Sequence, residues 1–305
     1  MKIPPWPGPE VPHASAVVPL RYEDITQDGR MSLELAPHAL GETVWKRLLQ
    51  HEPKAEALLK SGVIPILARL RVEGLPGPFS VDGEVEARGT YVVADSLGPD
   101  GQVDHVYLNM WGELSARHGH TYRPGSASEG PRAVASRVFA VHVMTRLFAP
   151  PGQRRVTALP SEMLLASPIR VELEPPEALL RLPEGAVALD AGLVLDPTPV
   201  VFGLLHTDSN QHVNSLVYLR VFEEALLRRL HARGRSTVVL SRMVEIVYRK
   251  PCFAGQVVQV ALQAFELDGK VGAVGVVVPA ADGRDDPAGI AAKPFATVQM
   301  VAEPG

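Results

Sequence analysis

The sequence lacks the features that define several large classes of protein. Its 305 residues include one cysteine, which excludes an intrachain disulfide and any metal site made of several cysteines. No apolar run approaches the roughly 20 residues that a membrane-spanning helix needs. The net charge of −4 gives no electrostatic reason to expect nucleic acid or an anionic membrane as a partner. We therefore expect no membrane and no nucleic-acid contacts, with the cytoplasm as the default location.

The first residues also lack the basic segment and apolar core of a secretion signal. Residues 1–13 contain five prolines, which predicts an extended N-terminal arm that lies on the surface or is disordered. The chain as a whole is 46% hydrophobic and 21% charged, the balance of a folded globular protein. Its length suits two domains of ordinary size or one large one.

The hydrophobic pattern has the same order of elements in both halves of the chain. Each half begins with strand and helix patterns and continues with several long strands. In the first half we expect a helix at 37–50 and strands at 16–22, 30–35, 63–72, 81–95, 103–117 and 134–148. In the second half we expect a helix at 215–233 and strands at 199–205, 237–248, 256–266, 271–278 and 294–301.

The proline-rich stretch between the halves predicts a connection. We place a first unit at 14–150, a connecting region at 151–198 and a second unit at 199–305. A long amphipathic helix followed by alternating strands is typical of an antiparallel sheet with one face laid against the helix. The predicted fold class is therefore α+β, with two units that share one order of elements.

Three polar side chains precede the predicted helix of the second half. They are Asp208, Asn210 and His212, in the segment His-Thr-Asp-Ser-Asn-Gln-His-Val-Asn. Free backbone N–H groups at a helix N-terminus favour developing negative charge, which suits acyl chemistry. The unperturbed pKa of histidine, about 6.5, lets His212 take a proton near neutral pH. Ordinary interpretations stay open: His212 as a structural histidine, Asp208 as a turn or cap residue, and Asn210 as part of an Asx turn.

This segment resembles a known family. The pattern Asp-x-Asn-x-His-Val-Asn, followed by Tyr218 and a helix that carries glutamates, is similar to the hotdog-fold thioesterases, and most of all to the acyl-acyl-carrier-protein (acyl-ACP) thioesterases. The segment Tyr-Arg-Lys-Pro-Cys at 248–252 resembles their Tyr-Arg-Arg-Glu-Cys. The resemblance implies two tandem hotdog units, each a long antiparallel sheet wrapped around a central helix. The two units would form an internal pseudo-dimer, and the chain could in turn form a homodimer.

The resemblance also implies hydrolysis of an acyl-ACP or acyl-CoA thioester to the free acid, in fatty acid or polyketide metabolism, with no metal and no other cofactor. His212 would activate the water, Asp208 would orient the imidazole or the water, and Asn210 would hold the thioester carbonyl or the water. The backbone N–H groups of Val213 and Asn214 would form the oxyanion site. Asn214 also suits the cap of the following helix.

The second matching segment departs from the family at a catalytic residue. The glutamate that precedes the cysteine in the plant enzymes is Pro251 here. Glu245, Glu223 or Glu224 would have to supply that carboxylate, although Glu245 also suits a solvated strand position. Cys252 is either a nucleophile or a small buried hydrophobe. Two rivals stay open: a hotdog acyltransferase or dehydratase acting on a carrier-bound acyl or polyketide intermediate, and a non-catalytic protein that binds acyl thioesters.

The first half does not reproduce the polar set where its helix opens, at 37–43. We therefore expect one active site per chain, with the first unit supplying the acyl pocket. Pocket candidates, each of which also suits ordinary core, are Trp45, Met110, Trp111 and Phe139. Three histidines that lack the carboxylate spacing of a metal site are His105, His118 and His120. A basic patch for an acidic carrier, or a solvated helix end, would be Arg228, Arg229, Arg233 and Arg235.

Overall fold

The chain divides into two compact units, Met1–Leu173 (unit 1) and Glu174–Gly305 (unit 2). The division lies inside the predicted connecting region at 151–198, and the later part of that region belongs to unit 2. Part of the stretch between the predicted strands at 103–117 and 134–148 lies outside the described residues. The computed structural model describes residues 2–121, 130–161, 165–280 and 294–305.

Unit 1 is built on an antiparallel sheet. Its strands are β1 (His13–Val18), β2 (Val63–Gly74), β3 (Val85–Leu97), β4 (Val103–Arg117), β5 (Arg132–Arg146) and β6 (Ile169–Arg170). The strand order is β1-β3-β4-β5-β2, and β6 pairs in parallel beside β3. Apolar residues alternate along β3, β4 and β5, so one face of this sheet can pack against a helix.

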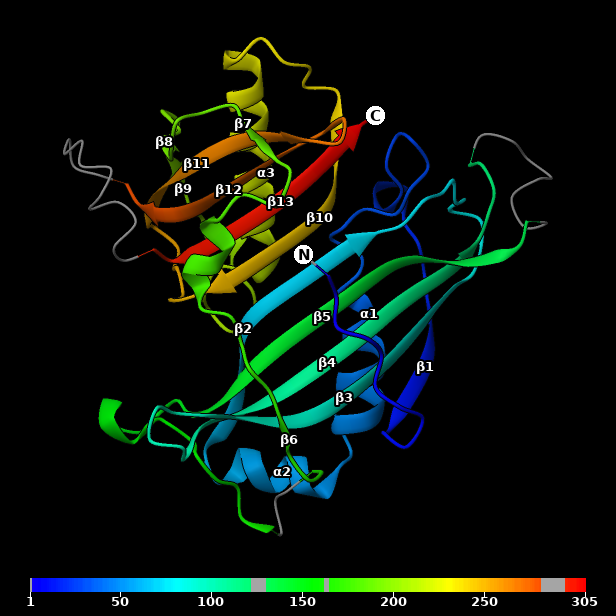
Figure 1. Cartoon of the computed structure of the whole chain (residues 1–305). Helices are drawn as coiled ribbons and strands as arrows, with labels where there is room; N and C mark the ends of the chain where they lie inside the picture. The colour runs from blue at the N-terminus through cyan, green and yellow to red at the C-terminus, as the bar shows by residue number, and fades with distance from the viewer. Residues whose placement is uncertain (1, 122–129, 162–164, 281–293) are drawn as a thin grey trace. The chain divides into compact units, whose positions relative to one another are not determined.

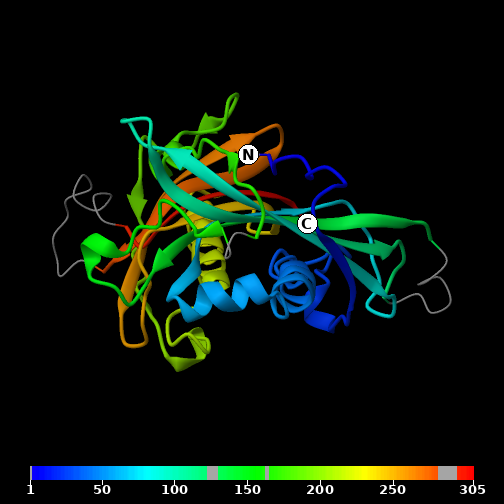
Figure 2. The same cartoon turned by 90° about the horizontal axis from the view of Figure 1, so that it is seen from below.

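That helix crosses the sheet of unit 1 where two glycines leave room for it (Figures 1 and 2). It consists of α1 (His38–Leu40) and π-helical turns, η2 (Gly41–Leu49). A Cβ atom added at Gly89 would collide with the Thr43 side chain, and one at Gly112 would press on Ala39 and Leu40. A second helix, α2 (Pro53–Lys60), follows and is not predicted by the sequence pattern.

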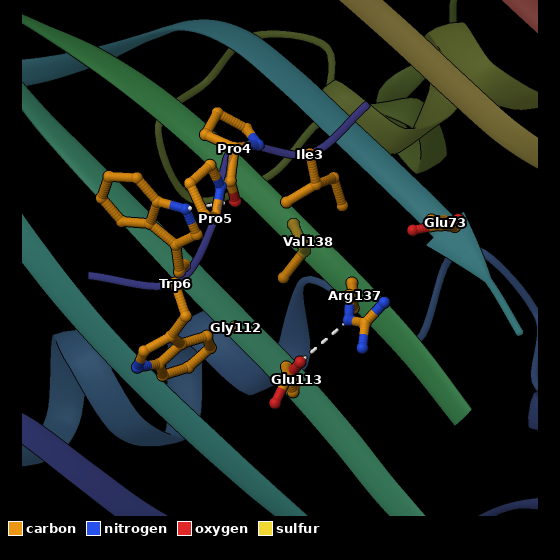
Figure 3. Close-up of a pocket in the computed structure, with 10 residues that line it drawn as sticks. Ile3, Pro4, Pro5, Trp6, Glu73, Gly112, Glu113, Arg137 and Val138 are labelled. Atoms are coloured by element: carbon orange, nitrogen blue, oxygen red, sulfur yellow. Dashed lines mark hydrogen bonds and ion pairs between the residues drawn. The ribbon is translucent and has the colours of Figure 1, made fainter. Parts of the chain in front are cut away.

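The N-terminal arm lies on the other face of the unit 1 sheet (Figure 1). The Trp111 indole donates to the Pro4 carbonyl at 3.1 Å, and Arg71 donates to the Lys2 carbonyl at 2.6 Å. Beneath the arm, Trp111 and Phe139 pack with their ring centroids 4.8 Å apart. These two residues are therefore core under the arm. A hollow of about 270 Å³ between arm and sheet is lined by Ile3, Pro4, Pro5, Trp6, Glu73, Trp111, Gly112, Glu113, Arg137 and Val138 (Figure 3).

Unit 2 is a second antiparallel sheet with one long helix. The strands are β7 (Val187–Ala188), β8 (Val194–Leu195), β9 (Val200–Val201), β10 (Val239–Tyr248), β11 (Val257–Leu267), β12 (Lys270–Pro279) and β13 (Ala296–Pro304). Their order is β10-β13-β12-β11, with β7, β8 and β9 each pairing with β11. The helix α3 (Ser215–Ala232) buries the apolar stripe Tyr218, Leu219, Phe222, Ala225, Leu226 and Leu230. Among the described residues, no helix has the length and apolar character to cross a membrane.

Two predicted strands are wrong. The run at 199–205 is a strand only at Val200–Val201, because its pairing partner β11 begins at Val257. Leu204 and Leu205 then turn outward, 81% and 101% exposed, in a 3-10 turn. Residues 30–35 are a turn with a single bridge, although three of their apolar side chains are buried. Burial alone produced the strand-like pattern there.

Candidate active site

The polar segment of unit 2 is a tight backbone loop that ends at the start of α3. We call this segment, residues 206–214, the motif loop. Thr207 and Val213 form an antiparallel bridge. Inside it, the Asp208 N–H donates to the His212 carbonyl at 3.2 Å, and the Gln211 N–H donates to the Asp208 carbonyl at 2.9 Å. Gln211 adopts a positive φ of 65°, which lets the chain reverse within so few residues. The motif loop is therefore fixed by its backbone.

Asp208 supports the turn and the helix cap. Its carboxylate accepts from the Asn210 backbone N–H at 2.9 Å, an Asx turn, and from the Asn214 side-chain amide at 3.3 Å. The Asn214 amide oxygen in turn accepts from the Leu216 N–H at 2.9 Å and caps α3. In the described part of the chain, neither a hydrogen bond nor an ion pair joins Asp208 to the His212 ring. The expected contact between these two side chains is thus replaced by one to Asn214.

The side chains of Asn210 and His212 make no hydrogen bond with any described residue. Asn210 is exposed, and His212 is half-buried. Both belong to the motif loop and lie close to the first turn of α3 in sequence. Their polar atoms are therefore open to water or a ligand, as a proton-accepting site requires.

The two backbone N–H groups expected to form an oxyanion site are occupied. The Val213 N–H donates to the Cys252 carbonyl at 2.7 Å, and the Asn214 N–H donates to the His206 carbonyl at 2.9 Å. Neither is free for a substrate oxygen in this structure. The next N–H along the chain, that of Ser215 at the first position of α3, has no acceptor among the described residues, so it is free to donate to a ligand.

Cys252 is buried completely, at 0% exposure. Burial raises the pKa of its thiol to about 11, and a hydrogen bond with Tyr218 offsets only part of that rise. A protonated, inaccessible thiol is a poor nucleophile. The structure favours the interpretation of Cys252 as a small buried hydrophobe.

Glu245 is buried too, at 2% exposure, so the solvated position considered for it is wrong. Tyr248, three residues later on β10, donates its hydroxyl to the Ser215 carbonyl and so faces α3. Side chains alternate along a strand, so Glu245 points to the opposite face. It pairs there with Gln299, whose amide donates to the Arg181 carbonyl. Glu245 therefore lies on the wrong face of the sheet to serve the motif loop.

The helix glutamates are also remote from the loop. Glu223 and Glu224 come about 12 Å along the axis from the start of α3, at 1.5 Å per residue. Glu224 is exposed and forms an ion pair with Arg228 at 3.6 Å. No carboxylate proposed from the sequence thus replaces the family's glutamate next to His212.

The basic patch at the end of α3 is neutralised. Arg228 pairs with Asp196 at 2.6 Å, and both Arg229 and Arg233 pair with Asp190. The fourth pair of this group joins Arg235 to Glu266 at 3.0 Å. These arginines fasten the helix to its own unit, so they offer little positive charge to an acidic carrier.

Of the remaining candidates, Trp45 is half-buried in unit 1, edge-on to His142 with ring centroids 5.4 Å apart. Met110 is fully buried. His105 pairs with Asp104 at 2.8 Å, and His118 stacks on Phe79. In the described ranges, no three His, Cys, Asp or Glu side chains gather closely enough to hold a metal ion.

Unit 1 contains a second copy of the motif loop, 182 positions earlier in the sequence, at 24–32. Ile25 and Met31 form the bridge that Thr207 and Val213 form in unit 2. Gly29, with a φ of 80°, takes the place of Gln211. The matching backbone hydrogen bonds run from Thr26 N to Arg30 O, Gly29 N to Thr26 O and Ser32 N to Asp24 O. Two units thus build the same turn, bond for bond.

The copy in unit 1 carries different side chains. Thr26, Asp28 and Arg30 replace aspartate, asparagine and histidine, and Asp28 pairs with Arg30 at 3.1 Å. The stretch 37–43, where the helix of the first half opens, does not contain this copy. The copy lies earlier, at 24–32, and shares no identity with the motif loop at these three positions. The signal available was Asp-Gly before a buried apolar residue and a helix, the pattern of a tight turn.

Comparison with known proteins places the fold. No protein-family model matches the sequence, and no curated protein matches it. Among solved structures, a protein from Lactobacillus plantarum described as an oleoyl thioesterase matches with a TM-score of 0.60 at 15% identity, over 97% of each chain. The 12:0-ACP thioesterase of Umbellularia californica matches with a TM-score of 0.55 at 11% identity, over 96% of this chain and 94% of that one.

A third solved structure, an acyl-ACP thioesterase from Bacteroides thetaiotaomicron, matches with a TM-score of 0.53 at 11% identity, over 95% of this chain and 98% of that one. At such identities the likeness concerns the fold. It agrees with the sheet and helix of each unit. The chain has the α+β fold of these thioesterase structures, with two tandem hotdog units, each an antiparallel sheet packed around a helix.

Proposed function

We propose that this chain is an acyl thioesterase that hydrolyses an acyl-ACP or acyl-CoA thioester to the free acid. The observation that carries the proposal is the repeated turn. Unit 1 closes the same turn with Thr26, Asp28 and Arg30, so the backbone does not require the side chains that unit 2 has there. An imidazole that the fold does not need, half-buried before a helix N-terminus, suits proton transfer.

In the proposed reaction, His212 takes a proton from water while the water oxygen bonds to the thioester carbonyl carbon. The carbonyl oxygen gains negative charge, and we assign the Ser215 N–H as its backbone donor. Asn210 holds the water or the carbonyl. The carbon–sulfur bond then breaks, and the imidazolium returns its proton to the leaving thiolate. Asp208 contributes by shaping the loop and holding the helix cap.

The names of two similar structures support a carrier-bound substrate, because both are ACP thioesterases. ACP and CoA present the same thioester, so either can deliver the acyl group. The internal pseudo-dimer of the two units, a homodimer and the cytoplasmic location stay predictions. The proposed reaction uses no cofactor.

The test is a thiol-release assay over acyl-ACP and acyl-CoA substrates of different chain lengths. The decisive variant moves the unit 1 residues into unit 2: Asp208→Thr, Asn210→Asp and His212→Arg together. We expect it to fold, since unit 1 folds with these residues, and to lose thiol release by about 100-fold or more, the usual contribution of a general base. Ser209→Ala, an exposed change in the same loop, is the matched control.

Full activity in the triple variant, or in His212→Ala, would refute the site. Product analysis separates the rivals, because a hydrolase yields free acid, an acyltransferase yields a new ester, and a dehydratase yields an enoyl thioester. Saturable binding of acyl-ACP with no thiol release by the wild-type protein would instead identify a non-catalytic binder.

A further inference from the structure

A chain of hydrogen bonds joins the motif loop to a buried tyrosine of α3. The Cys252 peptide stands in the middle: its carbonyl accepts from the Val213 N–H at 2.7 Å, and its N–H donates to the Tyr218 hydroxyl at 3.2 Å. Val213 directly follows His212. The backbone next to His212 is therefore connected, through the Cys252 peptide, to the Tyr218 side chain.

The tyrosine is itself held firmly. Tyr218 is 2% exposed, and its ring packs edge-on to Tyr248 with centroids 5.5 Å apart. The Tyr248 hydroxyl donates to the Ser215 carbonyl at 3.0 Å, in the first turn of the same helix. Burial raises the pKa of Tyr218 well above its ordinary value, so the hydroxyl stays neutral and its oxygen remains an acceptor. These contacts join the motif loop, the segment at Cys252 and the start of α3.

Unit 1 lacks this link although it has the same turn. At an offset of 182 positions, Tyr218 corresponds to Ala36, which lies in the turn before α1, is buried at 1% exposure and has no hydroxyl. The unit 1 copy is held instead by the Phe79 N–H, which donates to the Gly29 carbonyl at 2.6 Å. The tyrosine link is thus confined to the loop that carries the histidine. The turn forms in unit 1 without a tyrosine, so the tyrosine in unit 2 is not needed for the turn itself. It occurs in the copy that carries His212.

We propose that Tyr218 is a positioning residue for His212, acting through the Cys252 peptide and the Val213 N–H. The inference rests on the proposed hydrolysis by His212. The link itself runs through the Cys252 backbone, whereas the thiol makes a separate side-chain hydrogen bond with the Tyr218 hydroxyl. Loss of the hydroxyl leaves the Cys252 N–H buried without its acceptor, which loosens the peptide that holds the loop.

The experiment compares Tyr218→Phe, which removes only the hydroxyl, with Cys252→Ala, which removes the thiol and keeps the peptide. We expect Tyr218→Phe to lower kcat about tenfold with KM within about twofold, since the substrate contacts are intact. Cys252→Ala stays within about twofold of wild type in both constants. Wild-type kcat in Tyr218→Phe, or an equal loss in both variants, would overturn the proposal.

Two measurements do not depend on activity, so they separate this inference from the proposed function. The NMR signals of the His212 ring should move in Tyr218→Phe and keep their wild-type positions in Cys252→Ala, even if no thioester is cleaved. In the wild-type protein, the Val213 and Cys252 amide protons should exchange as slowly as the hydrogen-bonded amide protons in the middle of α3. Unmoved ring signals, or exchange at the rate of an open loop, would contradict the link.

Discussion

At the scale of single residues, His142 has the most altered acid–base behaviour of the described histidines. It lies on β5 within unit 1, 8% exposed, with its ring edge-on to Trp45. Burial lowers its pKa to about 4, because the charged imidazolium would lose its hydration there. The ring is therefore neutral at neutral pH and adds no charge to the interior of the unit.

This gives a prediction for stability. In the unfolded chain His142 has its ordinary pKa of 6.5, so between pH 6.5 and pH 4 the unfolded state binds the extra proton. The contribution of the neutral ring is complete above that window and falls as the pH drops through it. We expect the wild type to lose about 2 kcal/mol more unfolding free energy between pH 7 and pH 5 than His142→Leu does. Denaturant unfolding measures both losses. Equal losses in the two proteins would show that the pKa of His142 is not lowered in the folded state.

The residue pattern predicts the position of the motif loop better than it predicts side-chain contacts. Asp208, Asn210 and His212 are recognisable from their spacing, and the structure confirms that one short loop before a helix carries them. The contacts of each side chain could not be predicted from the sequence. Asp208 turned to Asn214, and Glu245 turned to the far face of its sheet, because partner and face depend on register across strands.

At the scale of elements, the close approach of helix and sheet in unit 1 depends on Gly89. Its missing Cβ leaves the space that the Thr43 side chain fills, and Thr43 itself bonds back to the Ala39 carbonyl. A methyl group at this position would force the helix or the Thr43 rotamer to shift.

We therefore expect Gly89→Ala to destabilise the protein by about 1–3 kcal/mol, the usual cost of overpacking. In Thr43→Ala the obstructing hydroxyl is absent, so Gly89→Ala should cost much less in that background. Thermal or denaturant unfolding of the four proteins completes a double-mutant cycle. Strictly additive losses would show that the two residues do not compete for the same space.

Long elements were predictable, and short ones were not. The strands at 103–117 and 257–267 and the helix from 215 follow their hydrophobic periods closely, since a long amphipathic element has one face to bury. The run at 199–205 has the same apolar content but only two residues of pairing. Its outcome was decided by where the neighbouring strand begins, which no local pattern contains.

At the scale of the whole molecule, the N-terminal arm covers an aromatic surface of unit 1. Trp111 and Phe139 are 6% and 4% exposed beneath it, and Ile3, Trp6 and Val11 pack on the same cluster. Trp6 also stacks under the Arg88 guanidinium, 5.5 Å from its ring centroid. The proline-rich arm thus lies on the surface of unit 1, which is one of the two alternatives expected from the sequence.

Deletion of residues 2–12 should expose that surface. We expect a lower unfolding temperature and stronger binding of a hydrophobic dye, because each large apolar side chain is worth about 1.5–3 kcal/mol when buried. Glu10→Ala, an exposed change within the arm, controls for alterations that leave the packing intact. An unchanged unfolding temperature after the deletion would mean that the arm contributes no net stability.

The repeated turn has a consequence for how this molecule could change over time. The two copies of this nine-residue turn have the same backbone hydrogen bonds with different side chains. Most substitutions in either copy should therefore affect the chemistry of the loop more than its folding. The copy at 24–32 can therefore accumulate substitutions while the copy at 206–214 keeps its side chains. The copy at 24–32 is also the place where new side chains could be introduced by mutagenesis.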